Sequence, residues 1–166
     1  MLHALVALVL CADGGVPPAT SQTWQAHPDV VAARAVFNEV RAALDAGKLS
    51  VRKSPACEEF SELSGFTDAT GTARMLVRRF GSSDSSQHVD AYYDDTGRLR
   101  FVFVRVDAVP SAWVEARWWI DEAGRVAWKS RASGGEGPTY YATELAPYFV
   151  KDPTAFVQQH TRCGKR

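Results

Sequence analysis

The chain has 166 residues, of which 46% are apolar and 23% are charged. This composition predicts a globular protein, and the length favours a single domain, which we expect to span residues 23–166. The 19 basic and 19 acidic residues cancel, so the chain lacks the overall positive field that drives binding to nucleic acids or to anionic membranes. A charged partner would have to recognise a local patch.

An apolar run occupies residues 2–12, and a polar, proline-containing stretch occupies residues 13–22. This order is typical of a secretory signal peptide, and the run is too short to span a bilayer. We therefore expect residues 1–22 to be a signal peptide and disordered leader, and the mature protein to be periplasmic or extracellular. Two alternatives stay open: a lipid anchor on Cys11, although Leu10 stands where lipoproteins prefer a small residue, and the N-terminal segment of a cytosolic protein.

Removing the leader leaves two cysteines, Cys57 and Cys163. An even number of cysteines in an exported protein predicts a disulfide. Closing a loop of roughly 100 residues would stabilise the fold by about 4–5 kcal/mol in the chain-entropy description. The alternative is two unrelated buried thiols. Neither cysteine belongs to a Cys-x-x-Cys motif, and the histidines are far apart in the sequence, so we predict no metal and no other cofactor.

The first expected element is a helix over residues 28–46. Its apolar side chains recur at spacings of three and four and form one stripe. Pro28 suits the first turn of a helix, and Gly47 suits the position after its end. A shorter helix is expected over residues 55–63 and would carry Cys57.

A hairpin signature occurs twice, at residues 93–101 and 120–128. In each copy a strand leads into Asp-acidic-x-Gly and leaves through Arg into another strand, as a tight antiparallel turn with a glycine at positive φ requires. Around these turns the hydrophobic period is two. Five strands are expected, at residues 73–80, 87–93, 98–106, 113–120 and 126–131. Because only two copies are visible, we interpret them as neighbouring hairpins of one meander.

The C-terminal region has a helical tendency near residues 143–150, and a last helix is expected over residues 153–160. Together the elements predict an α+β fold in which the N-terminal helix packs on a five-stranded antiparallel meander sheet, with a short second helix and a C-terminal helix. This order of elements is similar to that of cystatin-like and NTF2-like folds. The resemblance is one of fold order only and implies no activity.

Alternation along the strands predicts which side chains share a face of the sheet. The face that meets the N-terminal helix is expected to carry Val89, Ala91, Tyr93, Leu99, Phe101, Phe103, Val114, Ala116, Trp118, Ile120, Val126 and Trp128. The opposite face is expected to be basic and aromatic, with Arg74, Arg78, His88, Tyr92, Arg98, Arg100, Arg117, Trp119, Arg125, Lys129 and Arg131.

The basic and aromatic face is the predicted binding surface, because arginine and exposed rings bind anionic groups and glycan rings. Its candidate residues are Arg98, Arg100, Arg117, Trp119, Arg125, Lys129 and Tyr92. We expect a non-enzymatic exported domain that binds an unknown protein, anionic or glycan partner, with no nucleic-acid partner and no transmembrane segment. A purely structural interpretation stays open, in which the arginine stems cover half-buried sheet and pair with nearby carboxylates.

Two other functions fit the sequence. A curled sheet could form a small-ligand or enzyme pocket against the first helix, lined by Tyr93, Trp118, Trp128 and a His or Asp. An inhibitor of an extracellular enzyme would need a protruding loop, for which residues 81–86 and 133–138 are the candidates.

No catalytic residues are predicted. The carboxylate pairs at residues 94–95 and 121–122 stand in tight turns, where carboxylates normally cap the amides of the turn itself. The serines of residues 82–86 resemble a nucleophilic triad with His88 and Asp90 in composition only, because nothing in the sequence orients one of them as a nucleophile.

Overall fold

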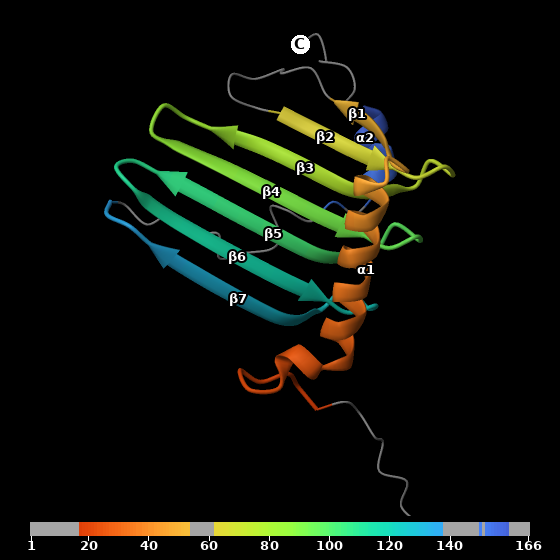
Figure 1. The fold of residues 1–166 in the computed structure, drawn as a ribbon, viewed down its shortest axis with the longest axis horizontal. Coiled ribbons are helices and arrows are strands. Elements are labelled where there is room, and N and C mark those ends of the chain that lie inside the picture. Colours follow the sequence, from red (N-terminus) through yellow and green to blue (C-terminus); the bar gives the residue numbers. More distant parts are fainter. Residues whose placement is uncertain (1–16, 54–61, 138–149, 151, 160–166) are drawn as a thin grey trace, which may run out of the picture.

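The computed structural model describes residues 17–53, 62–137, 150 and 152–159, which form an α+β fold (Figure 1). A short 3-10 helix, η1 (Trp24–Ala26), precedes the long helix α1 (Pro28–Asp45). The strands described after it are β1 (Ser50–Lys53), β2 (Glu62–Thr67), β3 (Ala73–Gly81), β4 (Ser85–Tyr93), β5 (Leu99–Ala108), β6 (Ala112–Ile120) and β7 (Val126–Gly134). A short helix, α2 (Pro153–Gln159), comes last. The strands form one antiparallel sheet in the order of the sequence, from β1 to β7.

The five expected strands are present as β3 to β7, but the sheet has seven strands because β1 and β2 precede them. Neither extra strand has a strong strand pattern: β1 is short and fully exposed, and β2 contains Ser64 and Gly65. Both of these residues are nevertheless buried, because β2 pairs with a strand on each side. The predicted helix over residues 55–63 is wrong at its end, since Glu62 and Leu63 belong to β2.

Several expectations fall on residues outside the described ranges. These are the leader up to residue 16, the part of the expected second helix over residues 55–61, and nearly all of the helical segment expected near residues 143–150. Cys11, Cys57 and Cys163, and with them the expected disulfide, also lie there.

Helix α1 begins and ends where the sequence predicts. Pro28 occupies the first turn, His27 is the N-cap and accepts a hydrogen bond from the Asp29 amide at 3.3 Å, and Gly47 follows the helix with φ +66°. The helix crosses one face of the sheet, near the turns that join β2 to β3, β4 to β5 and β6 to β7 (Figure 1). It leaves the other end of that face uncovered.

The described residues contain three copies of this hairpin turn, one more than the sequence pattern predicts. Asp68, Asp94 and Asp121 each begin a turn in which a backbone amide four residues later donates to the aspartate side chain. Three residues after each aspartate stands a glycine at φ +79° to +85°, which side chains rarely tolerate. The first copy, at residues 67–75, has no acidic residue after its Asp and no Arg after its Gly, and for this reason the sequence pattern shows only two copies.

Each of these hairpins contains a β-bulge just after the turn. In the β4–β5 hairpin Tyr93 pairs with Leu99 and Tyr92 pairs with Phe101, so Arg100 is an extra residue. The equivalent extra residues are Arg74 in the β2–β3 hairpin and Ala127 in the β6–β7 hairpin. An extra residue shifts the alternation by one position, so side chains beyond the bulge exchange faces.

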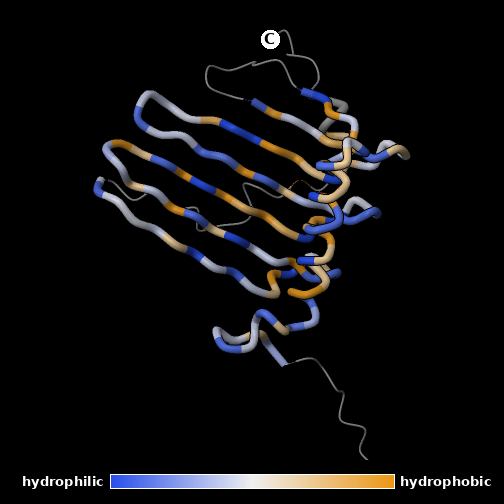
Figure 2. Tube along the Cα trace, viewed as in Figure 1, coloured by the Kyte–Doolittle hydropathy of each residue, from blue (hydrophilic) through white to orange (hydrophobic). Residues whose placement is uncertain are grey.

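The bulges correct the expected division of the sheet. The α1 face carries Met75, Val77, Tyr92, Phe101, Phe103, Trp119 and Trp128, packed with Val30, Ala33, Phe37 and Val40 of the helix. The opposite face carries Leu76, Val89, Ala91, Tyr93, Leu99, Val102, Val104, Ala116, Trp118 and Ile120. The set of residues expected to meet the N-terminal helix therefore mixed both faces of the sheet, and Tyr92 and Trp119, which were expected on the opposite face, lie under the helix. Figure 2 shows the hydrophobic and hydrophilic positions along the strands.

Two of the extra residues are buried arginines that join successive hairpins. Arg74 Nε donates to the Tyr93 carbonyl at 3.3 Å, and Arg100 Nε donates to the Ile120 carbonyl at 3.1 Å. Each guanidinium also lies near the aspartate of its own turn, Asp68 at 3.7 Å and Asp94 at 3.5 Å. We call these contacts the arginine bridges. They tie the end of each hairpin to the end of the next.

Candidate functional site

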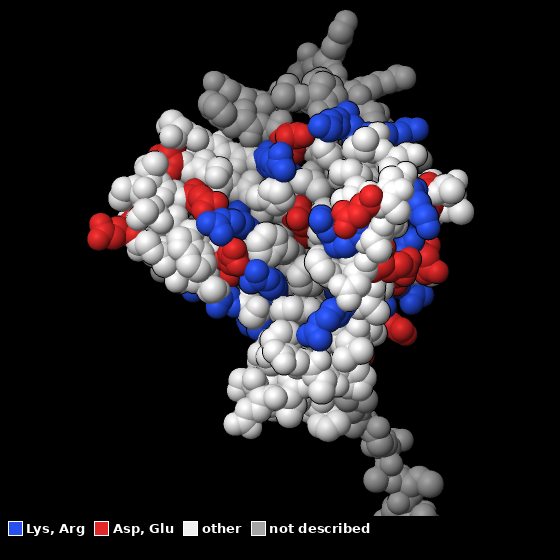
Figure 3. Space-filling view, viewed as in Figure 1, with Lys and Arg blue, Asp and Glu red and all other residues white. Residues whose placement is uncertain are grey.

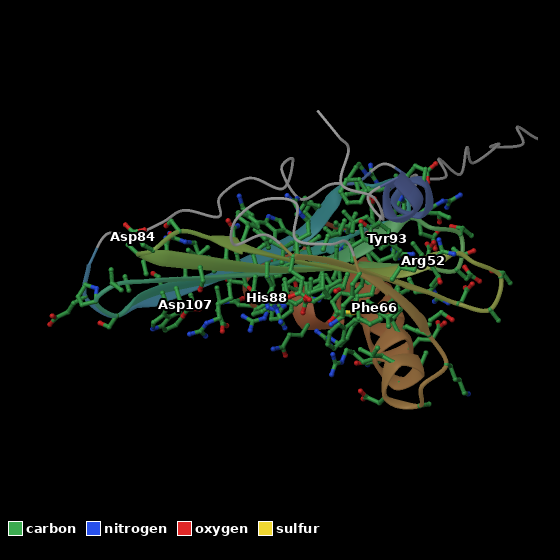
Figure 4. All side chains as sticks on the ribbon, turned by 90° about the horizontal axis from the view of Figure 1, so that it is seen from above. Arg52, Phe66, Asp84, His88, Tyr93 and Asp107 are labelled. Carbon is green, nitrogen blue, oxygen red and sulfur yellow. The ribbon has the colours of Figure 1, made fainter. Side chains whose placement is uncertain are left out.

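The part of the α1 face that the helix does not cover forms a polar surface, which we call the open sheet face. It consists of Arg79, His88, Asp90, Phe103, Arg105, Asp107, Trp113, Glu115 and Arg117, from β3 to β6. In Figure 4, His88 and Asp107 project to the same side of the sheet as α1, whereas Tyr93 projects to the other side. Figure 3 shows basic and acidic side chains next to one another on this side of the molecule.

One end of the open sheet face is hollowed. A depression of about 630 Å³ lies over the ends of β3, β4 and β5, beside the β3–β4 turn. Its lining includes Arg79, His88, Asp90, Phe103, Arg105 and Asp107. The depression therefore joins an aromatic ring to charged groups of both signs.

His88 is held by hydrogen bonds on both ring nitrogens. Its Nδ1 lies 3.3 Å from Arg79 Nε, which can only donate, and its Nε2 lies 2.7 Å from Asp90 Oδ1. These contacts assign the tautomer with the proton on Nε2, which then donates to Asp90. Both ring nitrogens are thus engaged by neighbouring side chains of the open sheet face.

Arg105 and Arg117 share the carboxylate of Glu115. The Arg105 guanidinium donates to Glu115 at 2.9 Å and to Asp107 at 2.7 Å, and Arg117 donates to Glu115 at 2.8 Å. Burial alone would raise the pKa of Glu115, but the hydrogen bonds from Arg117 and Arg105 outweigh it and hold that pKa below its usual value. The hydrogen bond to Asp107 raises the pKa of Arg105.

Aromatic rings lie beneath both arginines. The Arg117 guanidinium carbon is 4.9 Å from the ring centre of Phe103, and that of Arg105 is 5.6 Å from the ring centre of Trp113. These are cation–π distances. The arginines are thus fixed from the side by carboxylates and from below by rings, and the open sheet face, with three arginines and three acidic side chains, is close to neutral.

The residues predicted to form a binding surface do not come together. Tyr92 and Trp119 are only 2% and 7% exposed beneath α1, and Arg100 is buried in its bulge. Burial, with the nearby Asp90 carboxylate, raises the pKa of Tyr92 to about 12, so its hydroxyl stays neutral. These three side chains cannot meet a partner while the fold is intact.

The other predicted residues are exposed at separate places. Arg98 lies in the turn after β4, and Arg125 lies in the turn after β6, where it pairs with Asp121 at 2.7 Å. Lys129 is exposed on β7, and Arg117 alone belongs to the open sheet face. Most of that face was not predicted, although the alternation of Arg105 with Asp107 and of Trp113 with Glu115 was visible in the sequence.

The groups considered for catalysis have structural roles in this geometry. Asp94 and Asp121 cap their own turns, as expected. The Ser82 hydroxyl contacts Asp84 and Ser85 within the β3–β4 turn, so the structure joins His88 to Asp90 but shows no serine bonded to the imidazole. In the part of the chain that the structure describes, no group of three or more His, Cys, Asp and Glu side chains is arranged to hold a metal ion.

Aromatic side chains fill the space between α1 and the sheet. The Phe37 ring lies 4.9 Å from that of Tyr92 and 5.2 Å from that of Phe101, and Phe101 lies 5.3 Å from Trp119. Trp24 of η1 extends this cluster, at 4.9 Å from Trp119. The depression lies outside this packed layer, at the uncovered end of the sheet.

Comparisons with protein-family models, with curated proteins and with solved structures found no match to this chain. The fold analogy with cystatin-like and NTF2-like proteins is therefore without support from a solved structure. Among the helices described, none has the length and apolar character needed to cross a membrane.

Proposed function

We propose that this protein is a non-enzymatic binding domain that contacts a protein partner through the open sheet face. The leader expected at residues 1–22 supports a partner in the cell envelope or outside the cell. The observation that carries the proposal is the pair of arginines, Arg105 and Arg117, each fixed over an aromatic ring at the surface.

Arginine and aromatic residues are the side chains most often found at the centres of protein interfaces. A flexible arginine loses side-chain entropy when a partner immobilises it. Glu115 and Asp107 already hold Arg105 in place, at 2.9 and 2.7 Å, so less of that entropy remains to be lost. The alternating charges would in addition select a partner whose charges alternate in the complementary order.

A small molecule in the depression is the second candidate. The volume of about 630 Å³ falls within the usual range for ligand sites, and Phe103 offers a ring for stacking. Polar groups in ligand sites usually have hydrogen-bonding capacity left for the ligand, whereas here Arg79, His88 and Asp90 bind one another. That difference favours the protein partner.

The test compares two double variants that remove the same charge. Arg105→Ala with Arg117→Ala removes the fixed arginines, and Arg52→Ala with Arg98→Ala removes two exposed arginines from other surfaces. Each protein is immobilised and exposed to an envelope extract, and retained proteins are quantified by mass spectrometry. We expect a partner that the parent and control retain to be recovered from the open-face variant roughly thirtyfold less, as loss of about 2 kcal/mol predicts.

Circular dichroism and thermal melting must first show that both double variants are folded. Retention of the same proteins by all three forms would refute the proposal. If no protein is retained, and a low-molecular-weight fraction of the extract raises the melting temperature of the parent but not of Arg79→Ala, the small-ligand function would replace it.

A further inference from the structure

The outer edge of β7 is a second surface with the features of a binding site. Strand β7 runs for nine residues and pairs with β6 along one side. No described strand pairs with its other side, which is the end of the sheet. The opposite edge strand, β1, has only four residues, two of which are Arg52 and Lys53. Short, charged edges are protected from further pairing, whereas long edges are templates for it.

The geometry of β7 suits an additional strand. Beyond its bulge the register with β6 is regular from Trp128 to Gly134, and this stretch contains no proline. Of the features that normally prevent strand addition, a proline and a bulge are absent from this described stretch, whereas charged side chains, Lys129 and Arg131, are present.

The third hairpin also lacks an arginine bridge. Arg74 and Arg100 each donate to a carbonyl of the following hairpin, and Ala127 stands at the equivalent position in the β6–β7 hairpin. The bridge is missing where no further strand of the described chain follows. Among the described strands, none pairs with that edge of β7.

The charges of β7 identify the kind of strand that would fit. Lys129 and Arg131 are both exposed, and β7 has no acidic residue. Lys129 forms no ion pair with any residue of the described ranges. Directly opposed side chains of opposite charge stabilise an antiparallel pair, and like charges destabilise it.

These charges disfavour a second copy of this chain as the occupant. Consider two copies whose β7 strands pair antiparallel about their centres, with both α1 helices on the same face of the joined sheet. Depending on the register, Lys129 of one copy would lie opposite Arg131 or Lys129 of the other, or Arg131 would lie opposite Arg131. Each arrangement opposes two cations. An acidic segment would instead place a carboxylate opposite each cation.

We propose that the outer edge of β7 binds an extended acidic segment of a partner protein, which adds to the sheet as an eighth, antiparallel strand. Backbone hydrogen bonds supply most of the affinity, and Lys129 selects the acidic sequence. This proposal concerns a different surface from the open sheet face and stands or falls independently of it.

The probe is a nine-residue capped peptide with glutamates at alternating central positions and threonine or valine elsewhere. Binding to the full chain is followed by the amide resonances of isotope-labelled protein. We expect shifts and slowed amide exchange in β7, and clearly weaker binding of the same peptide with lysine in place of glutamate. Lys129→Glu should weaken binding about two- to thirtyfold, and the matched variant Lys48→Glu, at an exposed lysine after α1, should leave it unchanged.

N-methylation of the peptide distinguishes strand addition from simple charge attraction. Methyl groups on one set of alternate amides should abolish binding, and methyl groups on the other set should leave it intact, because only one edge of an added strand faces β7. Equal binding by both methylated peptides, shifts confined to another surface, or no binding would overturn the proposal. So would sedimentation equilibrium that shows a dimer together with slowed amide exchange in β7 without peptide, since a second copy would then occupy the edge.

Discussion

Replacing the two bridging arginines with methionine should destabilise the protein by different amounts. Methionine keeps most of the apolar stem but removes the guanidinium. Arg74 would lose its hydrogen bond to the Tyr93 carbonyl and its 2.7 Å contact with Glu39 of α1. Hydrogen bonds to charged groups contribute roughly 1.5–3 kcal/mol each when buried, and Glu39 is largely exposed. We therefore expect Arg74→Met to cost about 2–3 kcal/mol.

Arg100 makes fewer contacts for the same burial. Its Nε donates to the Ile120 carbonyl, but its Nη2 is buried without a hydrogen-bond partner among the described residues. An unsatisfied buried donor costs about 1–3 kcal/mol, and methionine would remove that cost together with the hydrogen bond. We therefore expect Arg100→Met to cost only about 1 kcal/mol.

Urea unfolding followed by circular dichroism measures both losses. With a slope of about 2 kcal/mol per molar urea, Arg74→Met should lower the midpoint by about 1–1.5 M and Arg100→Met by about 0.5 M. Arg98→Met, at an exposed arginine in the same turn region, is the control and should change stability by less than about 0.5 kcal/mol. If Arg74→Met matches this control, the bridges do not stabilise the sheet. If Arg100→Met costs as much as Arg74→Met, the comparison of their contacts is wrong.

Two further predictions concern the core and the turns. Trp119→Ala should lower the free energy of unfolding, measured in urea, by about 3–5 kcal/mol, clearly more than Trp128→Ala. The reason is that Trp119 is 7% exposed between Trp24 and Phe101, whereas Trp128 is half-buried. Equal losses would contradict this packing. Acid should destabilise the turns. Burial alone would raise the pKa of Asp94, but hydrogen bonds from Thr96 and from the Arg98 amide outweigh burial and hold that pKa below its usual value. The stability that Asp94 contributes is then complete above its unfolded pKa of about 3.9 and is lost as the pH falls from there through the lower folded value. Unfolding of Asp94→Asn should depend less on pH in that window, and an unchanged pH profile would show that the carboxylate is not stabilised by folding.

The elements that the sequence predicts well are those fixed by local chemistry. The apolar stripe of residues 28–46, with Pro28 and Gly47 at its ends, is enough to define α1. The glycines at positive φ and the alternation around them are enough to define the strands β3 to β7. By contrast β2, with Ser64 and Gly65 in its centre, becomes a strand only because β1 and β3 pair with it.

The division of the faces could not be predicted, and the reason lies at Arg100. Leu99, Phe101 and Phe103 alternate with Arg100, Val102 and Val104 as if the strand were regular. The bulge at Arg100 places Leu99 on one face and Phe101 on the other, yet the sequence contains no gap in the alternation. The open sheet face depends on this shift, since it decides that Arg105 and Asp107 share a side with α1.

The length of α1 sets a limit on the width of the sheet. Its 18 residues span about 27 Å, and neighbouring strands lie about 4.8 Å apart, so one such helix can shield only five or six strands. A fourth hairpin inserted into the meander would present its apolar residues to water on the α1 side. A longer relative of this fold would therefore need a proportionately longer helix, or a second one placed end to end with the first.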